Sequence, residues 1–331
     1  MKIIASVSKI EDLPEYWENP LQQKSFVKRS LFDNLMQESS LNILFQSLSF
    51  SDETIVNDSY SILELLCRGS RQRTALIYQL NIINYFPQTP NCNFGNILFD
   101  IISLLQIEIT MPIRQLIHSM LLSTNCNHIQ SALKIYNLAF SRKIVPLIED
   151  VSSQYEPISR ILLSKIPSIV VAALFLVNKF SILSDDVLFA VAISINTPGI
   201  KAPTKAISIL RKFFGRLVEL RNPIILSSLI NSLQFSQFKL KLKVLKFLDM
   251  YAQFADFNDN SYIDTLMGFL DDSQLSFYAL KILCVAFGQY ESRGRVCDFY
   301  SVAKQFEESI IQILIGDNEV NSQLAQIIEP P

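Results

Sequence analysis

The sequence predicts an all-α protein built as a right-handed α-solenoid of stacked helical hairpins. The first observation is that the chain has only 8 glycines in 331 residues, whereas average usage would give about 23. Doubly wound enzymes and tight β-hairpins need glycine for phosphate loops and turns. The second is that 49% of the residues are apolar, and these recur at helical spacing far more often than at period two. The third is that the breaks between them are short and polar, which favours helices joined by short turns.

Apolar residues three, four and seven positions apart mark each predicted helix, because these positions share one face. Two examples are Val56, Tyr60, Leu63 and Cys67, and Ile129, Leu133, Tyr136 and Phe140. In chain order, the predicted helices span residues 25–37, 41–49, 53–68, 73–86, 94–107, 112–123, 127–141, 155–164, 167–180, 185–195, 203–220, 223–233, 237–255, 261–270, 274–290 and 297–315.

The helices are expected to form one array. Residues 1–24, which include Trp17, are expected to be an irregular entry or cap segment. Residues 25–316 are predicted to form a single continuous helical-repeat domain, and residues 317–331 a C-terminal tail. No break is long enough, or rich enough in Ser and Gly, to be a flexible linker.

Internal similarity supports repetition. LINSLQFSQFKLKLKVLKFL at 229–248 and LMGFLDDSQLSFYALKILCVAF at 266–287 share a helix end, a short polar turn and a longer apolar helix. LFQSLSFSDETIVNDSYSILELL at 44–66 follows the same scheme with a longer turn. These segments resemble the last two helices of an armadillo or HEAT repeat, best over 41–86 and 225–290. The resemblance implies an α-solenoid scaffold that holds protein partners.

Spacing excludes several kinds of catalytic and cofactor site. The glycines are never closer than six positions, so the dinucleotide fingerprint, the P-loop and the nucleophile elbow are absent. The two histidines, His118 and His128, are too few for a multi-histidine metal site. Cys92 and Cys126 could join them in a zinc site, but Cys92 and His118 lack the nearby companion ligands of structural zinc sites. We therefore expect no enzymatic activity, no cofactor and no metal.

Two pairs of carboxylates raise the alternative of a magnesium site. They are Asp185-Asp186 and Asp271-Asp272. Neither has a third carboxylate one turn further on, and carboxylates near a helix start interact favourably with the positive end of its dipole. We predict that both pairs cap helices.

Neither secretion nor a membrane span is expected. The apolar run 166–177 spans about 18 Å as a helix, against a hydrocarbon core of about 30 Å. We predict a helix buried on all sides that starts at Pro167. The five cysteines are scattered and odd in number, which is typical of reduced thiols. The N-terminus has too short an apolar stretch for a secretory signal. The expected location is the cytoplasm, with the nucleus as the alternative.

Charge is distributed unevenly. Residues 201–246 contain ten basic side chains and one acidic side chain, Glu219, whereas residues 247–331 contain four basic and thirteen acidic ones. Lys239, Lys243 and Lys246 fall at i, i+4 and i+7 of a predicted helix and so form one charged stripe. Like charges one turn apart repel, so the stripe costs stability and suggests an acidic ligand.

Three interpretations of these bases stay open: a face that is solvated or paired with the next repeats, a surface for acidic protein segments, and a surface for nucleic acid or an anionic membrane. We expect an interaction scaffold, with a helical-repeat protein that binds or processes nucleic acid as the alternative. That alternative would need Arg211, Arg216 and Lys243 to converge near a buried carboxylate. The candidate partner-binding residues are Arg211, Lys212, Arg216, Lys239, Lys243 and Lys246.

Overall fold

The structure is a computed structural model that describes residues 32–86, 92–152, 155–235, 237–316 and 318–329. Within these ranges the chain is all-α and contains no strand, which confirms the predicted class. The expected entry segment 1–24, with Trp17, lies outside the described residues. The same holds for residues 25–31 of the first predicted helix.

The described residues form two compact units, one ending at Val151 and the other beginning at Ser152. The helices up to this boundary are α3 (Glu38–Ser47), α4 (Glu53–Cys67), α5 (Arg71–Gln79), η2 (Ile82–Tyr85), α6 (Cys92–Leu105), α7 (Met111–Leu122), α8 (Cys126–Arg142) and α9 (Val145–Ser152).

Helices of the first unit pack in consecutive pairs. Helices α3, α5 and α7 each pack on the helix that follows, and α4, α6 and α8 pack on one another in succession. Local capping sets where several of them begin. The Asp52 carboxylate accepts the backbone N–H groups of Thr54 and Ile55 at the start of α4, and such caps satisfy donors that a helix leaves unbonded.

The second unit contains the larger number of helices. They are α10 (Tyr155–Leu162), α11 (Pro167–Val177), α12 (Asp185–Ile193), η3 (Ser194–Asn196), α13 (Lys201–Lys212), α14 (Phe214–Leu220), α15 (Pro223–Phe235), α16 (Phe238–Tyr251), η4 (Ala252–Phe254), α17 (Asn260–Met267), α18 (Ser276–Ser292), α19 (Val296–Ala303), η5 (Lys304–Phe306), α20 (Glu307–Leu314) and α21 (Glu319–Ile328).

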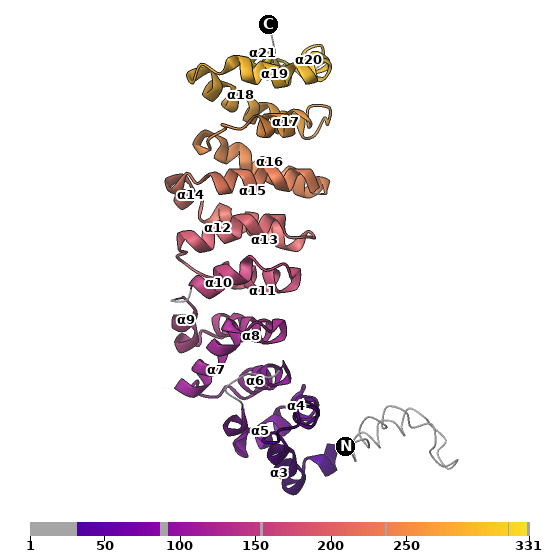
Figure 1. The fold of residues 1–331 in the computed structure, drawn as a ribbon, viewed down its shortest axis with the longest axis vertical. Helices are drawn as coiled ribbons and strands as arrows, with labels where there is room; N and C mark the ends of the chain where they lie inside the picture. Colours follow the sequence, from indigo (N-terminus) through magenta and orange to yellow (C-terminus); the bar gives the residue numbers. More distant parts are fainter. Residues whose placement is uncertain (1–31, 87–91, 153–154, 236, 317, 330–331) are drawn as a thin grey trace, which may run out of the picture. The chain divides into compact units, whose positions relative to one another are not determined.

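Two successions of helices build the second unit (Figure 1). Helices α10, α12, α15, α17 and α19 pack one on the next, and so do α11, α13, α16, α18 and α21. The pairs α10–α11, α12–α13, α15–α16 and α17–α18 connect the two successions as hairpins. This arrangement brings α13 and α16, which carry most of the basic residues of 201–246, side by side.

Aromatic side chains fill the core around α16. The fully buried Phe247 ring lies 6.3 Å from the Tyr251 ring in a stacked arrangement. The Phe214 ring, next to the junction of α13 and α14, meets Phe247 edge-on at 6.2 Å. Such pairs add specific geometry to the burial of apolar area.

Two helices lie where the sequence predicted none. Helix α9 was missed, and Arg114 of α7 forms an ion pair with its Asp150 at 3.5 Å. Helix α21 lies within residues 317–331, which the sequence predicts to be a tail. It packs on α18 and α20 and buries Ala325 and Ile328.

Several predicted helices are divided, and another is less buried than predicted. The predicted helix 73–86 corresponds to α5 and η2, 237–255 to α16 and η4, and 297–315 to α19, η5 and α20. The predicted helix 203–220 breaks at Phe213, where the backbone leaves helical geometry with φ −106° and ψ 26°. Helix α11 begins at Pro167, as predicted. It is not buried on all sides, because Phe175 is 49% exposed. The continuous array over 25–316 stays a prediction.

Candidate interaction surface

Helix α13 buries one side and presents a basic side to solvent. Its buried residues are Ala202, Pro203, Ala206, Ile207, Ile209 and Leu210. On the other side, Lys201 and Arg211 are exposed. Lys205 is half-buried, and its Nζ lies 4.9 Å from the centroid of the Phe175 ring on α11. Because neither α11 nor α13 contains Asp or Glu, these positive charges have no carboxylate on either helix.

Helix α16 confirms the predicted helical reading of the Lys-rich segment. Its predicted inward-facing residues are all buried: Leu240, Val244, Phe247, Leu248 and Tyr251. Lys239, Lys243 and Lys246 are exposed on the other side. The Lys246 Nζ lies 5.5 Å from the centroid of the Tyr278 ring on α18, a favourable cation–π contact that leaves the ammonium accessible.

Lys212 is committed to the fold. Its Nζ donates hydrogen bonds to the carbonyl oxygens of Asn178, at 2.9 Å, and Phe180, at 2.5 Å. Both carbonyls follow the end of α11, where cationic side chains commonly satisfy the last acceptors of a helix. Lys212 therefore ties α13 to α11, and its charge is partly used there.

Arg216 is also engaged within the protein. It lies on α14 and forms ion pairs with Asp185 of α12, at 2.9 Å, and with Glu219, at 2.8 Å. Hydrogen bonds to Glu219 and Asp185 raise the pKa of the guanidinium above its ordinary value. Asp185 follows Ser184, whose hydroxyl caps α12 by accepting the N–H of Val187. The predicted position of Asp185-Asp186 at a helix start is confirmed, although the capping side chain is Ser184.

Six basic residues make up what we call the basic face: Lys201, Lys205 and Arg211 on α13, and Lys239, Lys243 and Lys246 on α16. Within the described chain, none of them forms an ion pair. Arg211, Lys239 and Lys243 also have no hydrogen bond there. Lys201 and Lys205 were not among the predicted partner-binding residues, although they lie one turn apart on a helix that also carries Lys212.

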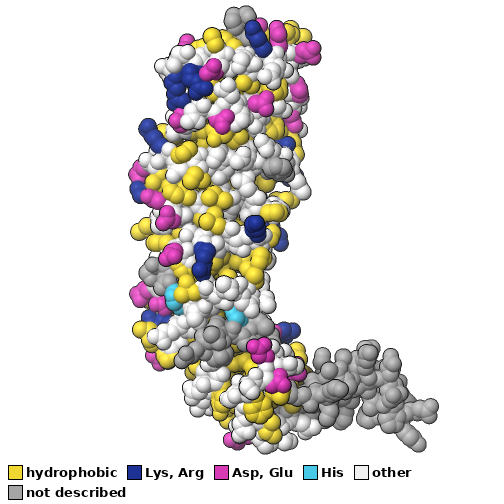
Figure 2. Space-filling model, in the orientation of Figure 1, with side chains coloured by type: hydrophobic (Ala, Val, Ile, Leu, Met, Phe, Trp, Pro, Cys, Tyr) yellow, Lys and Arg dark blue, Asp and Glu magenta, His cyan; other side chains and the backbone are white. Residues whose placement is uncertain are grey.

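Several acidic residues that follow in the chain form ion pairs with Lys or Arg residues outside α13 and α16. Asp249 of α16 forms an ion pair with Lys281 of α18 at 2.8 Å. Arg293 pairs with Asp256, and Arg295 with Asp298. Figure 2 shows one face of the molecule, on which Lys and Arg side chains over the C-terminal helices lie close to Asp and Glu side chains. The basic face differs from this mixed surface in lacking paired carboxylates.

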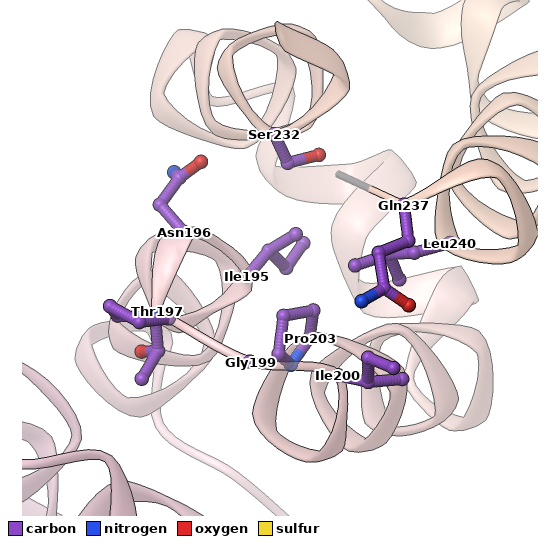
Figure 3. Close-up of a pocket in the computed structure, with 10 residues that line it drawn as sticks. Ile195, Asn196, Thr197, Gly199, Ile200, Pro203, Ser232, Gln237 and Leu240 are labelled. Carbon is purple, nitrogen blue, oxygen red and sulfur yellow. The ribbon is translucent and has the colours of Figure 1, made fainter. Parts of the chain in front are cut away.

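A pocket of about 400 Å³ opens where α13 and α16 begin (Figure 3). Its lining comes from η3, from the following loop, from α15 and from the starts of α13 and α16. The residues are Ile195, Asn196, Thr197, Pro198, Gly199, Ile200, Pro203, Ser232, Gln237 and Leu240. None of them is charged, so the pocket is suited to an apolar or weakly polar group.

The residues considered for metal binding do not form a site in the described part of the chain. There, no group of three or more His, Cys, Asp or Glu side chains could hold a metal ion. His128 is buried, and its Nδ1 lies 3.0 Å from the Ser123 hydroxyl. The second carboxylate pair takes part in capping, because Asp272 accepts the N–H groups of Gln274 and Leu275 just before α18. The side chain of Cys92 lies outside the described residues.

The arrangement that a nucleic-acid-processing site would need is not found among the described residues. The carboxylates that Arg216 contacts, Asp185 and Glu219, are not buried. Among these residues, the buried polar side chains include no Asp or Glu. No described helix combines the length and the apolar character needed to cross a bilayer.

Comparisons with known proteins add no functional identification. No protein-family profile matches the chain. No curated protein sequence matches it. Among solved structures, the chain is similar to an engineered protein whose crystal structure was determined by a structural genomics consortium, with 10% sequence identity over 90% of each chain and a TM-score of 0.43. Similarity at this level does not indicate a function, so the proposal below rests on the chain's own residues.

Proposed function

We propose that this protein is an interaction scaffold, an α-solenoid of armadillo or HEAT type that binds acidic segments of partner proteins through the basic face. The observation that carries the proposal is the grouping of six basic side chains on two adjacent helices with no carboxylate paired to any of them in the described chain. A surface of this kind has a favourable electrostatic interaction to offer a partner of opposite charge.

Packing of the helices supports the scaffold part of the proposal. In each unit, second helices of successive hairpins lie against one another, as they do in stacked helical repeats. A solenoid presents its second helices as a continuous ladder, so side chains on α13 and α16 can contact one extended segment together. A preformed surface also lowers the ordering cost of binding.

The charge arrangement supports an acidic partner. Lys239, Lys243 and Lys246 repel one another along α16, and each such pair costs a few tenths of a kcal/mol, on the order of 0.2–0.5. Ion pairs with carboxylates of the same chain would offset that cost, as the pair with Asp185 does for Arg216. No described carboxylate does so for Lys239 or Lys243, which leaves an external ligand as the explanation we favour.

Affinity purification with mass spectrometry from the native cell tests the proposal. Wild type would be compared with a Lys239→Glu, Lys243→Glu, Lys246→Glu variant. The matched control replaces three exposed lysines on other elements, Lys143, Lys165 and Lys304, by Glu, which changes the net charge equally. Circular dichroism establishes that all three proteins are folded.

We expect specific partner proteins with acidic segments to be recovered by wild type and by the control, and lost by the α16 variant. The same partners retained by the α16 variant would contradict a binding role for the basic face. Recovery of nucleic acid alone, lost with the α16 variant, would replace the proposal with the nucleic-acid-binding alternative.

A further inference from the structure

The pocket and the basic face are continuous along the chain. Ile200 lines the pocket and directly precedes Lys201. Gln237 and Leu240 line it and flank Lys239. A segment lying across the first turns of α13 and α16 would therefore meet lysine side chains and the pocket within the same few residues.

The pocket exposes apolar surface. Ile200, which lines it, is 49% exposed, and Ile195, Pro203 and Leu240 supply further apolar lining (Figure 3). Hydrating this surface is unfavourable, and an apolar group entering the pocket would remove part of it from water. The volume of about 400 Å³ lies within the range of sites that hold drug-sized ligands, so one large side chain can enter.

Electrostatics at the rim favour carboxylates on either side of that group. Neither Ile200 nor Gln237 caps its helix through a side chain, so the positive ends of both helix dipoles add to the charges of Lys201 and Lys239. A carboxylate inside the pocket would instead lose hydration against Ile195, Pro203 and Leu240. The site thus favours a ligand with an apolar side chain in the pocket and carboxylates on either side of it.

We infer that the acidic segment bound by the basic face carries one aliphatic or aromatic anchor residue, whose side chain enters this pocket. This inference rests on the proposed function and specifies the partner's sequence chemistry. The anchor would fix the register of the segment, while Asp and Glu residues beside it would contact Lys201, Lys205, Lys239 and Lys243. Charge alone would leave the segment free to slide along the lysines.

Selection from a library of random 16-residue peptides displayed on phage tests the inference with the full chain as bait. We expect the enriched peptides to be rich in Asp and Glu and to share one Leu, Ile, Met or Phe at a fixed place among them. A synthetic peptide with that residue replaced by Ser should bind about tenfold more weakly, as expected when an apolar side chain is lost from a pocket.

Variants of the protein locate the anchor. Ile200→Ser should weaken binding of the selected peptide, and Ile182→Ser should not, because Ile182 is 72% exposed in the link before α12 and does not line the pocket. A peptide carrying photoreactive diazirine-leucine at the anchor position gives a second readout that does not depend on stability. It should crosslink to residues 195–203 or 237–240.

The outcomes separate the inference from the proposed function. Acidic peptides without a shared apolar residue, still lost with the α16 variant, would overturn the inference and leave the proposed function standing. Crosslinks elsewhere would do the same. Peptides without acidic enrichment would overturn both, and apolar peptides that bind the pocket independently of Lys239 would assign it to a different ligand.

Discussion

The Nζ of Lys212 lies 2.5 Å from the carbonyl oxygen of Phe180, and this hydrogen bond sets Lys212 apart from the six residues of the proposed binding surface. Lys212 and Lys243 are both exposed lysines on adjacent helices. One closes the end of α11, and the other has no hydrogen bond or ion pair with any described residue. Substitution of Lys212 should therefore affect stability, whereas substitution of Lys243 should affect binding.

We expect Lys212→Met to lower the free energy of unfolding by about 1–2 kcal/mol, because hydrogen bonds from a charged donor to two carbonyls are lost while the apolar stem is kept. Lys243→Met should change stability little. Chemical denaturation followed by circular dichroism measures both. Equal stability of the two variants would mean that the bonds of Lys212 contribute nothing.

Binding of an acidic peptide should depend on salt. Raising sodium chloride from about 0.05 M to about 0.5 M shortens the screening length severalfold and should weaken the contacts of Lys239, Lys243 and Lys246. Fluorescence anisotropy with a labelled peptide selected on the protein measures the dissociation constant. Lys243→Met should reduce both the affinity and its salt dependence, whereas Lys212→Met should leave them unchanged. A salt-insensitive affinity would argue against the basic face.

The glycine in α6 is required by close packing. A Cβ at Gly95 would lie 2.6 Å from Met120 Cε and 2.7 Å from Ser131 Cβ. Gly95→Ala should destabilise the protein by about 1–3 kcal/mol through overpacking. Gly288→Ala is the control, since nothing lies within 4 Å of its Cβ position in α18, and it should stabilise the helix by up to about 1 kcal/mol. Urea denaturation distinguishes the two, and a neutral Gly95→Ala would show that Met120 moves aside freely.

The cysteines should react with alkylating reagents in an order set by burial. Cys297 is exposed, whereas Cys67 is fully buried and burial raises the pKa of its thiol to about 12. Because the thiolate is the reactive form, iodoacetamide at neutral pH should modify Cys297 first and Cys67 only after unfolding. Peptide mapping by mass spectrometry gives the order. Early modification of Cys67 in the native protein would contradict the packing of α4.

The carboxyl of Asp100 on α6 should make stability depend on pH. Burial, and after it the negative charge of Glu64, raises the pKa of Asp100 above its ordinary value. The native state therefore holds the proton more tightly than the unfolded state, so this contribution is fully present below the unfolded pKa and is lost as pH rises through the folded pKa.

Asp100→Asn should accordingly be more stable than wild type at pH 7, with the difference shrinking toward pH 4. Denaturation midpoints across this range measure it, with Asp58→Asn as a control because Asp58 is exposed on α4. A variant that is less stable than wild type at every pH would show that attraction to Arg68 and Lys134 outweighs the cost of burying the Asp100 carboxylate.

Most helices could be predicted from the sequence because each buries an apolar stripe that its spacing reveals. Helix α9 was missed because it buries only two residues, Leu147 and Val151, too few for the apolar pattern to repeat. Helix α21 was missed because the burial of Ala325 and Ile328 depends on its packing against α18 and α20.

The candidate surface was predictable only in part. Spacing placed Lys239, Lys243 and Lys246 on one side of α16, since that is a property of a single helix. The partners of Lys212, and Asp185 as one partner of Arg216, lie more than thirty positions earlier, on or near α11 and α12. The pocket likewise joins residues around 195–203 to residues around 232–240. Contacts of this range depend on how the helices pack, which spacing along one helix does not encode.

The main contacts of the second unit join helices at most three places apart in order. Unfolding of α20 and α21 would thus remove contacts of α18 directly and affect α16 only through α18. Local unfolding can therefore proceed stepwise from an end of the unit. A ligand that binds both α13 and α16 would stabilise the packing of these two helices in the interior of the unit. It would slow amide hydrogen exchange in helices it never touches, with protection fading toward α21.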